Sequence, residues 1–152
     1  MAERKFIAVD LGAESGRVML GTLAGGAGGR LELHEAHRFP NIAVCSGTGT
    51  WHWDILRLWH EIKTGIAKVT AAHQVSGIAV DTWGIDFGLL DARGELLGNP
   101  VCYRDARTMG MVEKVFARLP QERVYALTGI QTMPINTLFH LAALSATGSP
   151  QL

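Results

Sequence analysis

Residues 8–20, AVDLGAESGRVML, join two apolar runs through a short corner that contains Asp10 and two glycines. This pattern is typical of two strands that meet at a tight turn. The corner is either only a turn or a concave site in which backbone N–H groups and the Ser15 hydroxyl hold an anion. The second alternative would use the conformational freedom of Gly12 and the fixed positive charge of Arg17. It would also place Asp10, at the end of its strand, to hold Mg²⁺ through water.

The composition is that of an ordinary globular chain. Of its 152 residues, 47% are hydrophobic and 18% are charged, so one domain with a real core is expected. The 14 Lys and Arg residues balance the 14 Asp and Glu residues, which gives no reason to expect binding to nucleic acid or an anionic membrane. The N-terminal region lacks an apolar stretch long enough for a signal peptide or a membrane span. Cys45 and Cys102 have no metal-ligand spacing, and we expect reduced thiols in a cytoplasmic protein.

The hydrophobic periodicity predicts an α/β domain with a mixed sheet flanked by helices. Strands are expected at residues 5–10, 16–23, 31–39 and 76–80. The glycine-rich segment at 24–29 lies between two strands and not before a helix, so we expect a hairpin loop and not a phosphate-binding loop. A second hairpin is expected from strands at 85–90 and 96–103, which flank the turn sequence DARGE.

The strongest helix signal begins after Asp54, a favourable N-cap residue. Apolar residues then recur on one helical face from Ile55 to Val69. Shorter helices are expected at residues 107–118, 121–128 and 136–146. The segment YRDART at 103–108 is either a further site segment or an Asp–Arg turn that opens a helix. Because a sheet of this kind normally continues after such a helix, we expect the domain to be truncated.

A second acidic corner, GIAVDTWGIDFGLLD at 77–91, repeats the first arrangement. Asp81 follows a buried strand, and open α/β sheets bind ligands where carboxyl strand ends lie side by side. Trp83 could supply an aromatic wall, and Gly84 would let the backbone approach a ligand closely. The alternative is that Asp81 caps its own turn, Trp83 lies in the core and Asp86 is solvated.

The motifs, taken in order, resemble those of the FGGY-type carbohydrate kinases, which have the actin-like, ribonuclease H-like fold. The similarity runs from about Phe6 to Leu144 and is carried by AVDLGAESGRVML, HRF, WD, GIAVDTWGIDFGLLD, PVCYRDART, GIQ and PINTL. Within the family, the chain is most similar to the members that act on L-rhamnulose. The resemblance implies transfer of the γ-phosphoryl group of ATP, with Mg²⁺, to the 1-hydroxyl of L-rhamnulose, forming L-rhamnulose 1-phosphate.

The resemblance also implies roles for the residues of both corners. The positions that match the ATP-phosphate loop of the family are Ala13, Glu14, Ser15, Gly16 and Arg17. Gly12 is added to this group because of its backbone freedom. Asp10 matches the carboxylate that is associated with Mg²⁺. Gly84 matches a position that touches the sugar, and we expect the adjacent Trp83 to line the sugar pocket.

Part of the family pattern is missing from this chain. In these kinases two domains close on a cleft, and the aspartate that accepts the hydroxyl proton lies well beyond residue 152. We therefore expect residues 1–152 to be the N-terminal part of a kinase, without the general base and the domain that holds adenine, and inactive alone. The chain has His140 at a position where the resemblance to the family implies a glutamine.

Three other functions stay open at this point. The acceptor could be another ketose, such as fuculose or xylulose. A ribonuclease H-like two-metal nuclease would gather Asp10, Asp81 and Asp86 around metal ions, although the zero net charge disfavours nucleic-acid binding. A non-enzymatic sugar or nucleotide sensor would keep the fold without a general base.

Overall fold

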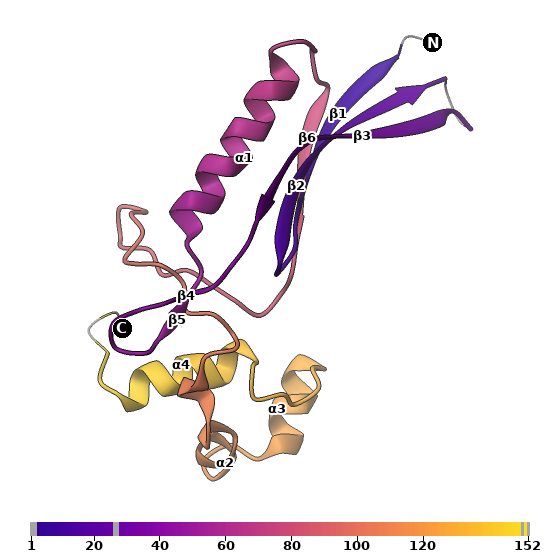
Figure 1. Cartoon of the computed structure of the whole chain (residues 1–152). Helices are drawn as coiled ribbons and strands as arrows, with labels where there is room; N and C mark the ends of the chain where they lie inside the picture. The colour runs from indigo at the N-terminus through magenta and orange to yellow at the C-terminus, as the bar shows by residue number, and fades with distance from the viewer. Residues whose placement is uncertain (1–2, 26–27, 150, 152) are drawn as a thin grey trace. The chain divides into compact units, whose positions relative to one another are not determined.

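The structure is a computed structural model that describes residues 3–25, 28–149 and 151. Backbone contacts divide the chain into two compact units (Figure 1). The first unit comprises Met1–Ala43 and Asp54–Gly84, and the second comprises Val44–Trp53 and Ile85–Leu152. That both units belong to one kinase domain, as the sequence predicts for residues 1–152, stays a prediction.

The first unit is built on a four-stranded mixed sheet with the strand order β3-β2-β1-β6. Its strands are β1 (Arg4–Leu11), β2 (Ser15–Ala24), β3 (Arg30–Pro40) and β6 (Gly77–Thr82). The first three pair in an antiparallel manner, whereas β6 pairs with β1 in parallel after the helix α1 (Ile55–Thr70). The predicted strands and long helix are thus confirmed. The predicted glycine-rich loop joins β2 to β3, and its residues 26–27 lie outside the described residues.

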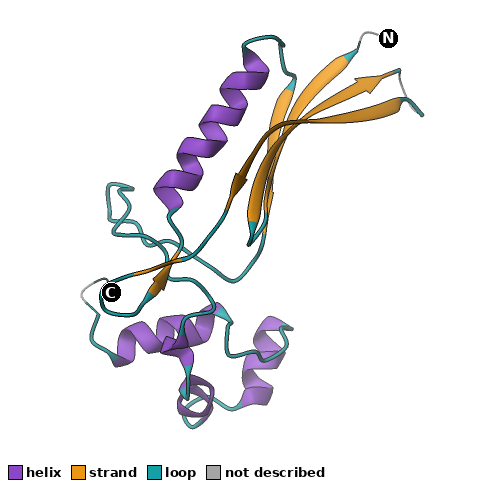
Figure 2. Ribbon diagram, in the orientation of Figure 1, coloured by secondary structure: helices purple, strands orange, loops and turns teal. Residues whose placement is uncertain are grey.

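Helix α1 covers one face of this sheet, as the ribbons show (Figure 2). The buried side chains between helix and sheet form the core of the unit, namely Ile7, Val9, Leu11, Val18, Leu20, Phe39, Leu58 and Val69. Gly65 permits the close approach of α1 to β2, because a Cβ at this position would lie 2.4 Å from Cγ2 of Val18. Asp54 caps the helix as predicted, by accepting a hydrogen bond from the Arg57 N–H at 3.2 Å.

Strand β3 contains a β-bulge at Ala36, which changes the set of side chains that share a face. The β2 partners of His37 and Glu35 are consecutive residues, so Ala36 between them has no register partner. In a regular strand, residues three apart have side chains on opposite faces. Across the bulge, Glu35 and Arg38 instead lie on the same face, opposite α1. His37 lies on the α1 face, where its Nε2 is 2.7 Å from Oε2 of Glu61.

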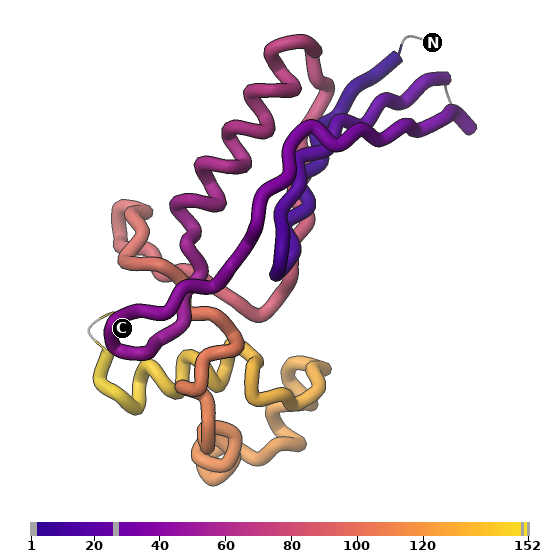
Figure 3. The backbone as a smooth tube through the Cα atoms, in the orientation of Figure 1, coloured from indigo at the N-terminus to yellow at the C-terminus, as the bar shows by residue number. Residues whose placement is uncertain are grey.

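The second unit contains a short β-hairpin, a 3-10 helix and three α-helices. Strands β4 (Val44–Cys45) and β5 (Trp51–His52) form the hairpin, within a segment for which the sequence predicted no regular structure. The helices are α2 (Met111–Phe116), α3 (Gln121–Thr128) and α4 (Thr137–Ala146), whose path Figure 3 traces in orange and yellow. The bounds of α3 and α4 confirm the predicted helices at 121–128 and 136–146. No helix among the described residues is long and apolar enough to cross a membrane.

The hairpin predicted from strands at 85–90 and 96–103 is wrong. Leu90 and Leu96 form a single isolated bridge there, and neither segment is a strand. The turn DARGE between them does form, but the second segment contains Pro100, which has no N–H group to donate to a ladder. The apolar residues of these two segments therefore lie in backbone without regular secondary structure.

The helix predicted at 107–118 is split. Gly110 has a φ of 72°, in the left-handed region, and it separates α2 from the 3-10 helix η1 (Ala106–Thr108). Asp105 caps η1 by accepting a hydrogen bond from the Arg107 N–H at 2.9 Å. The segment YRDART therefore contains the Asp–Arg turn that was one of its two explanations.

Candidate functional site

The corner between β1 and β2 places its charged residues on the sheet face opposite α1. Asp10 is the register partner of Arg17 on β2 and of Asp81 on β6, and Arg17 is the partner of Arg38 on β3. Register partners on neighbouring strands have their side chains on the same face. These four residues thus form one line across the sheet, which we call the charged row.

Asp10 and Asp81 lie near the carboxyl ends of adjacent parallel strands, since β1 ends one residue after Asp10 and β6 ends one residue after Asp81. The expectation that the two acidic corners lie side by side is confirmed by this register. Such an edge is where open α/β sheets bind ligands. The carboxylates and the β1–β2 loop therefore share one end of the sheet.

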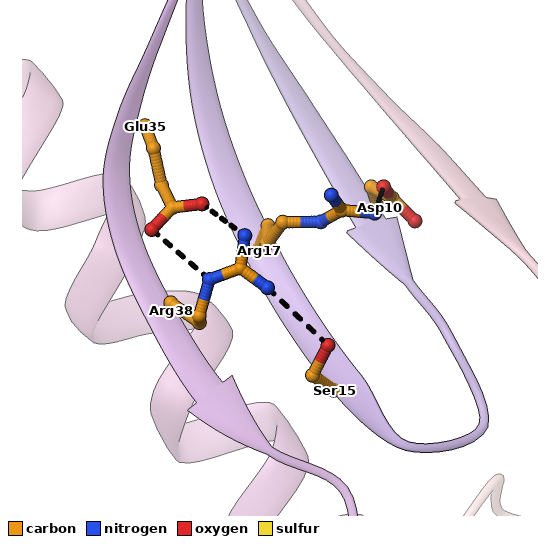
Figure 4. Close-up of polar contacts among 5 residues, drawn as sticks. All are labelled: Asp10, Ser15, Arg17, Glu35 and Arg38. Carbon is orange, nitrogen blue, oxygen red and sulfur yellow. Dashed lines mark hydrogen bonds and ion pairs between the residues drawn. The ribbon is translucent and has the colours of Figure 1, made fainter.

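The arginines of the charged row are each held by a carboxylate (Figure 4). Nη2 of Arg17 donates to Oδ2 of Asp10. Arg38 donates from Nε to Oε1 of Glu35 at 3.1 Å and from Nη2 to Oε2 at 2.5 Å, and its Nη1 lies 3.5 Å from the Ser15 Oγ. The hydrogen bond from Arg38 lowers the pKa of Glu35, and the bond to Glu35 raises the pKa of Arg38. Both arginines are thus held by carboxylates beside the loop.

Asn41 supports the loop between β1 and β2, a role that sequence reasoning missed. It is 2% exposed. Its backbone N–H donates to the Glu14 carbonyl at 3.0 Å, and its Nδ2 donates to the Gly12 carbonyl at 2.9 Å. An asparagine after a proline carries no local signal for this contact, which spans 29 positions of the sequence.

Gly12 has an ordinary negative φ and a specific hydrogen bond. Among the described residues, the positions with positive φ are Ile85 and glycines outside this loop, so Gly12 does not use the left-handed conformation that a glycine tolerates. Its N–H instead donates to the Ser15 carbonyl at 3.0 Å. A Cβ at Gly12 would lie 3.1 Å from that same oxygen, which explains a glycine here. A glycine at position 16 is explained in a similar way, because a Cβ there would lie 2.2 Å from Cζ of Phe39.

Two buried polar atoms at this corner have no hydrogen-bond partner within the described part of the chain. They are the donor Nε of Arg17 and the acceptor Oδ1 of Asn41. Leaving a buried polar group unpaired costs about 1–3 kcal/mol. An anion at the loop would supply an acceptor for the Arg17 Nε–H.

The second corner combines an aromatic side chain with open space. Trp83 is partly buried and packs against the core cluster of the first unit, as the core alternative predicted. A Cβ at Gly84 would meet no atom within 4 Å. The next residue, Ile85, has a φ of 87°, a value that β-branched residues rarely adopt. Asp86 accepts a hydrogen bond from Nε1 of Trp53 at 2.7 Å, so the alternative of a merely solvated Asp86 is wrong.

The described ranges contain no group of three or more His, Cys, Asp or Glu side chains that could hold a metal ion. Of the three carboxylates that a two-metal nuclease would need, Asp10 and Asp81 pair within the charged row of the first unit, whereas Asp86 belongs to the second unit.

A buried histidine occupies the position at which a glutamine was expected. His140 is 2% exposed, and its Nδ1 accepts a hydrogen bond from Nε of Arg107 at 3.0 Å. Burial, and then the charge of Arg107, lower the pKa of His140. The neutral imidazole thus acts as a hydrogen-bond acceptor, as the carbonyl of a glutamine side chain would.

Residues 6–146 match the sequence model of the N-terminal domain of the FGGY family of carbohydrate kinases. A rhamnulokinase from Pectobacterium carotovorum subsp. carotovorum is 44% identical over 100% of the chain, and one from Bacteroides thetaiotaomicron is 43% identical over 93%. The chain spans 30% and 29% of the lengths of these two relatives.

Solved structures of sugar kinases share the fold. A gluconate kinase from Lactobacillus acidophilus has a TM-score of 0.79 at 16% identity, with 99% of this chain and 30% of that chain covered. A xylulose kinase from Lactobacillus acidophilus has a TM-score of 0.76 at 16% identity, with 96% and 29% covered. The predicted α/β fold of the actin-like class is confirmed.

Proposed function

Because this chain belongs to the FGGY family of carbohydrate kinases, we propose that it forms the N-terminal part of an ATP-dependent kinase that converts L-rhamnulose to L-rhamnulose 1-phosphate. The identity to rhamnulokinases over nearly the whole chain supports this substrate over fuculose or xylulose. The charged row is the observation that carries the proposal, because it places Asp10, Asp81 and Arg17 beside one loop. A metal–nucleotide needs carboxylates for the cation and donors for the phosphates in one place.

The β1–β2 loop and the start of β2 would bind the phosphates of ATP. We assign this contact to Gly12, Ala13, Glu14, Ser15, Gly16 and Arg17. The buried and unpaired Nε–H of Arg17 supports the assignment, because a phosphate oxygen would complete its hydrogen bonding. The Ser15 side chain lies on the same face of β2 as that of Arg17, and its hydroxyl lies next to Arg38.

Asp10 is the residue that would hold Mg²⁺. The donors present fit the ion, since Mg²⁺ in nucleotide sites is held by one or two carboxylates together with phosphate oxygens and water. The bound ion would neutralise negative charge on the phosphates during transfer. In this structure Arg17 holds the Asp10 carboxylate within the charged row.

Gly84 and Trp83 would contact the sugar. The open space at Gly84 admits a ligand close to the backbone, and Trp83 offers an aromatic surface. We assign no catalytic residue to this chain: the general base and the adenine contacts would come from residues beyond 152. An enzyme that uses ATP in sugar breakdown would work in the cytoplasm.

A parallel assay of the full-length gene product with Mg-ATP and L-rhamnulose, L-fuculose or D-xylulose tests the proposal. We expect the highest kcat/KM for L-rhamnulose, with the 1-phosphate identified by ³¹P NMR. Absence of product from all three ketoses would refute the kinase proposal, and a higher kcat/KM for another ketose would refute the substrate. The 152-residue chain alone should form no product.

Binding to the chain itself gives a second test. In a ¹⁵N-labelled sample, we expect Mg-ADP to shift amide signals of residues 12–17 and L-rhamnulose to shift those of residues 83–84. Dispersed spectra that neither ligand changes would contradict the two assignments.

A further inference from the structure

A second arginine lies beside the proposed phosphate loop. Arg38 is the register partner of Arg17, and its Nη1 lies 3.5 Å from the Ser15 hydroxyl oxygen. Its side chain is half exposed. The guanidinium group is therefore within reach of an anion that Ser15 and Arg17 would bind, and it is still accessible from solvent.

The β-bulge of β3 creates the contact that orients Arg38. If Ala36 were paired in a regular strand, Glu35 would lie on the α1 face, away from Arg38. With the bulge, the two oxygens of Glu35 bind Nε and Nη2 of Arg38, and Nη1 is left on the side of Ser15 (Figure 4). A two-point contact of this kind fixes the plane of the guanidinium group. Bulges are common next to active sites, where they redirect a side chain.

The charges in the row also favour an anion at this place. Arg17 is held by Asp10, and Arg38 is held by Glu35. If Asp10 binds Mg²⁺, Arg17 loses its carboxylate partner and the two neighbouring arginines carry excess positive charge. A polyphosphate at the loop would neutralise that charge.

We propose that Arg38 is a further phosphate-binding residue of this site and that Glu35 positions it. The inference rests on the proposed function, because it adds a residue outside the loop to the binding of the same polyphosphate. Arg17 would approach the phosphates through Nε from β2, and Arg38 through Nη1 from β3. Glu35 keeps the other donors of Arg38 engaged and holds its group in place.

The same strand provides a matched control in Arg30. It forms a single ion-pair contact with Glu32 at 3.2 Å, with side chains 82% and 62% exposed. Arg30 pairs in register with Ala24, at the end of β2 far from Ser15. Its replacement removes the same charge and an ion pair with a glutamate, without touching the β1–β2 loop.

The test titrates the ¹⁵N-labelled chain with Mg-tripolyphosphate, with adenosine as a ligand that lacks phosphate. We expect Arg38→Gln to raise the Kd for Mg-tripolyphosphate about tenfold, because one charged hydrogen bond to the phosphate is lost. Arg30→Gln should change it less than about twofold, because solvent ions screen a distant charge. Equal values for these two variants would overturn the inference. If the wild-type chain does not bind Mg-tripolyphosphate, the proposed phosphate loop fails as well.

Glu35→Gln separates positioning from charge. Removal of a negative charge alone would tighten the binding of an anion. If Glu35 positions Arg38, the variant should instead bind Mg-tripolyphosphate about threefold more weakly, because the guanidinium group is no longer held. Tighter binding would overturn the positioning role. Arg38→Lys keeps the charge but lacks the planar guanidinium group. We expect its Kd to lie between those of the wild type and Arg38→Gln. This variant can replace Arg38→Gln in the test if the glutamine variant does not fold.

Discussion

Replacement of Gly16 by alanine tests why a glycine stands within the proposed phosphate loop. A Cβ at this position would lie 2.2 Å from Cζ and 2.3 Å from Cε2 of Phe39, and 3.1 Å from Cδ1 of Leu11. Phe39 is 2% exposed and belongs to the core under α1. Its ring cannot turn away without losing core contacts, so we expect the added methyl group to strain the sheet.

Two effects of opposite sign decide how much Gly16→Ala changes the free energy of unfolding. Alanine is better than glycine within a strand by about 0.5–1 kcal/mol, because glycine loses more backbone freedom on folding. An extra methyl group in a filled core costs about 1–3 kcal/mol. The aromatic ring is rigid and enclosed, so the second effect should prevail. We expect Gly16→Ala to lower the free energy of unfolding by about 1–2 kcal/mol.

Urea unfolding followed by circular dichroism measures this change, provided that the m-value stays as in the wild type. The matched background is Phe39→Leu, in which a smaller side chain leaves room for the methyl group. There, Gly16→Ala should cost less or even stabilise the chain. A Gly16→Ala protein as stable as the wild type would refute the reasoning. An equal cost in both backgrounds would show that the ring is not the obstacle.

Three other predictions concern the cores and thiols. Gly65→Ala improves helix propensity, yet we expect a loss of about 1–2 kcal/mol in urea unfolding, because its Cβ would lie 2.4 Å from a core side chain. Burial and Arg107 lower the pKa of His140, so only the unfolded chain gains this proton below about pH 6.5, and stability should fall from there with falling pH. His140→Gln should flatten that slope in urea unfolding between pH 8 and 5; an unchanged slope would contradict the assignment. Cys45 is exposed, whereas Cys102 is buried with a pKa raised by burial, so a thiol reagent should label Cys45 much faster, and equal labelling by mass spectrometry would refute this.

The sheet of the first unit could be predicted because its signals are local. Apolar runs mark β1, β2 and β6, and Asp54 marks the start of α1. The hairpin expected around DARGE failed because period-2 alternation does not ensure pairing, and Pro100 removes a ladder donor. The single helix expected at 107–118 was wrong because Gly110 was not recognised as a break.

The site could be predicted only in part. An acid at the end of an apolar run is visible in sequence, and Asp10 and Asp81 were found in this way. Their direct pairing depends on the parallel register of β1 and β6, which the sequence does not encode locally. The contact between Glu35 and Arg38 was missed because regular alternation places them on opposite faces. Such a bulge leaves no local signal, because Ala36 is an ordinary residue for a strand.

The bulge at Ala36 makes the geometry beside the loop depend on a count of residues and not only on their identity. Ala36 is the residue without a β2 partner, so its deletion would place Glu35 directly before His37 and restore regular alternation, with Glu35 and Arg38 still on the same face. A one-residue slip, in which Ala36 paired with Met19, would instead turn Glu35 toward α1, and every residue of β3 before it would change face. A deletion of Ala36 should therefore keep the contact between Glu35 and Arg38, whereas such a slip of the register should break it.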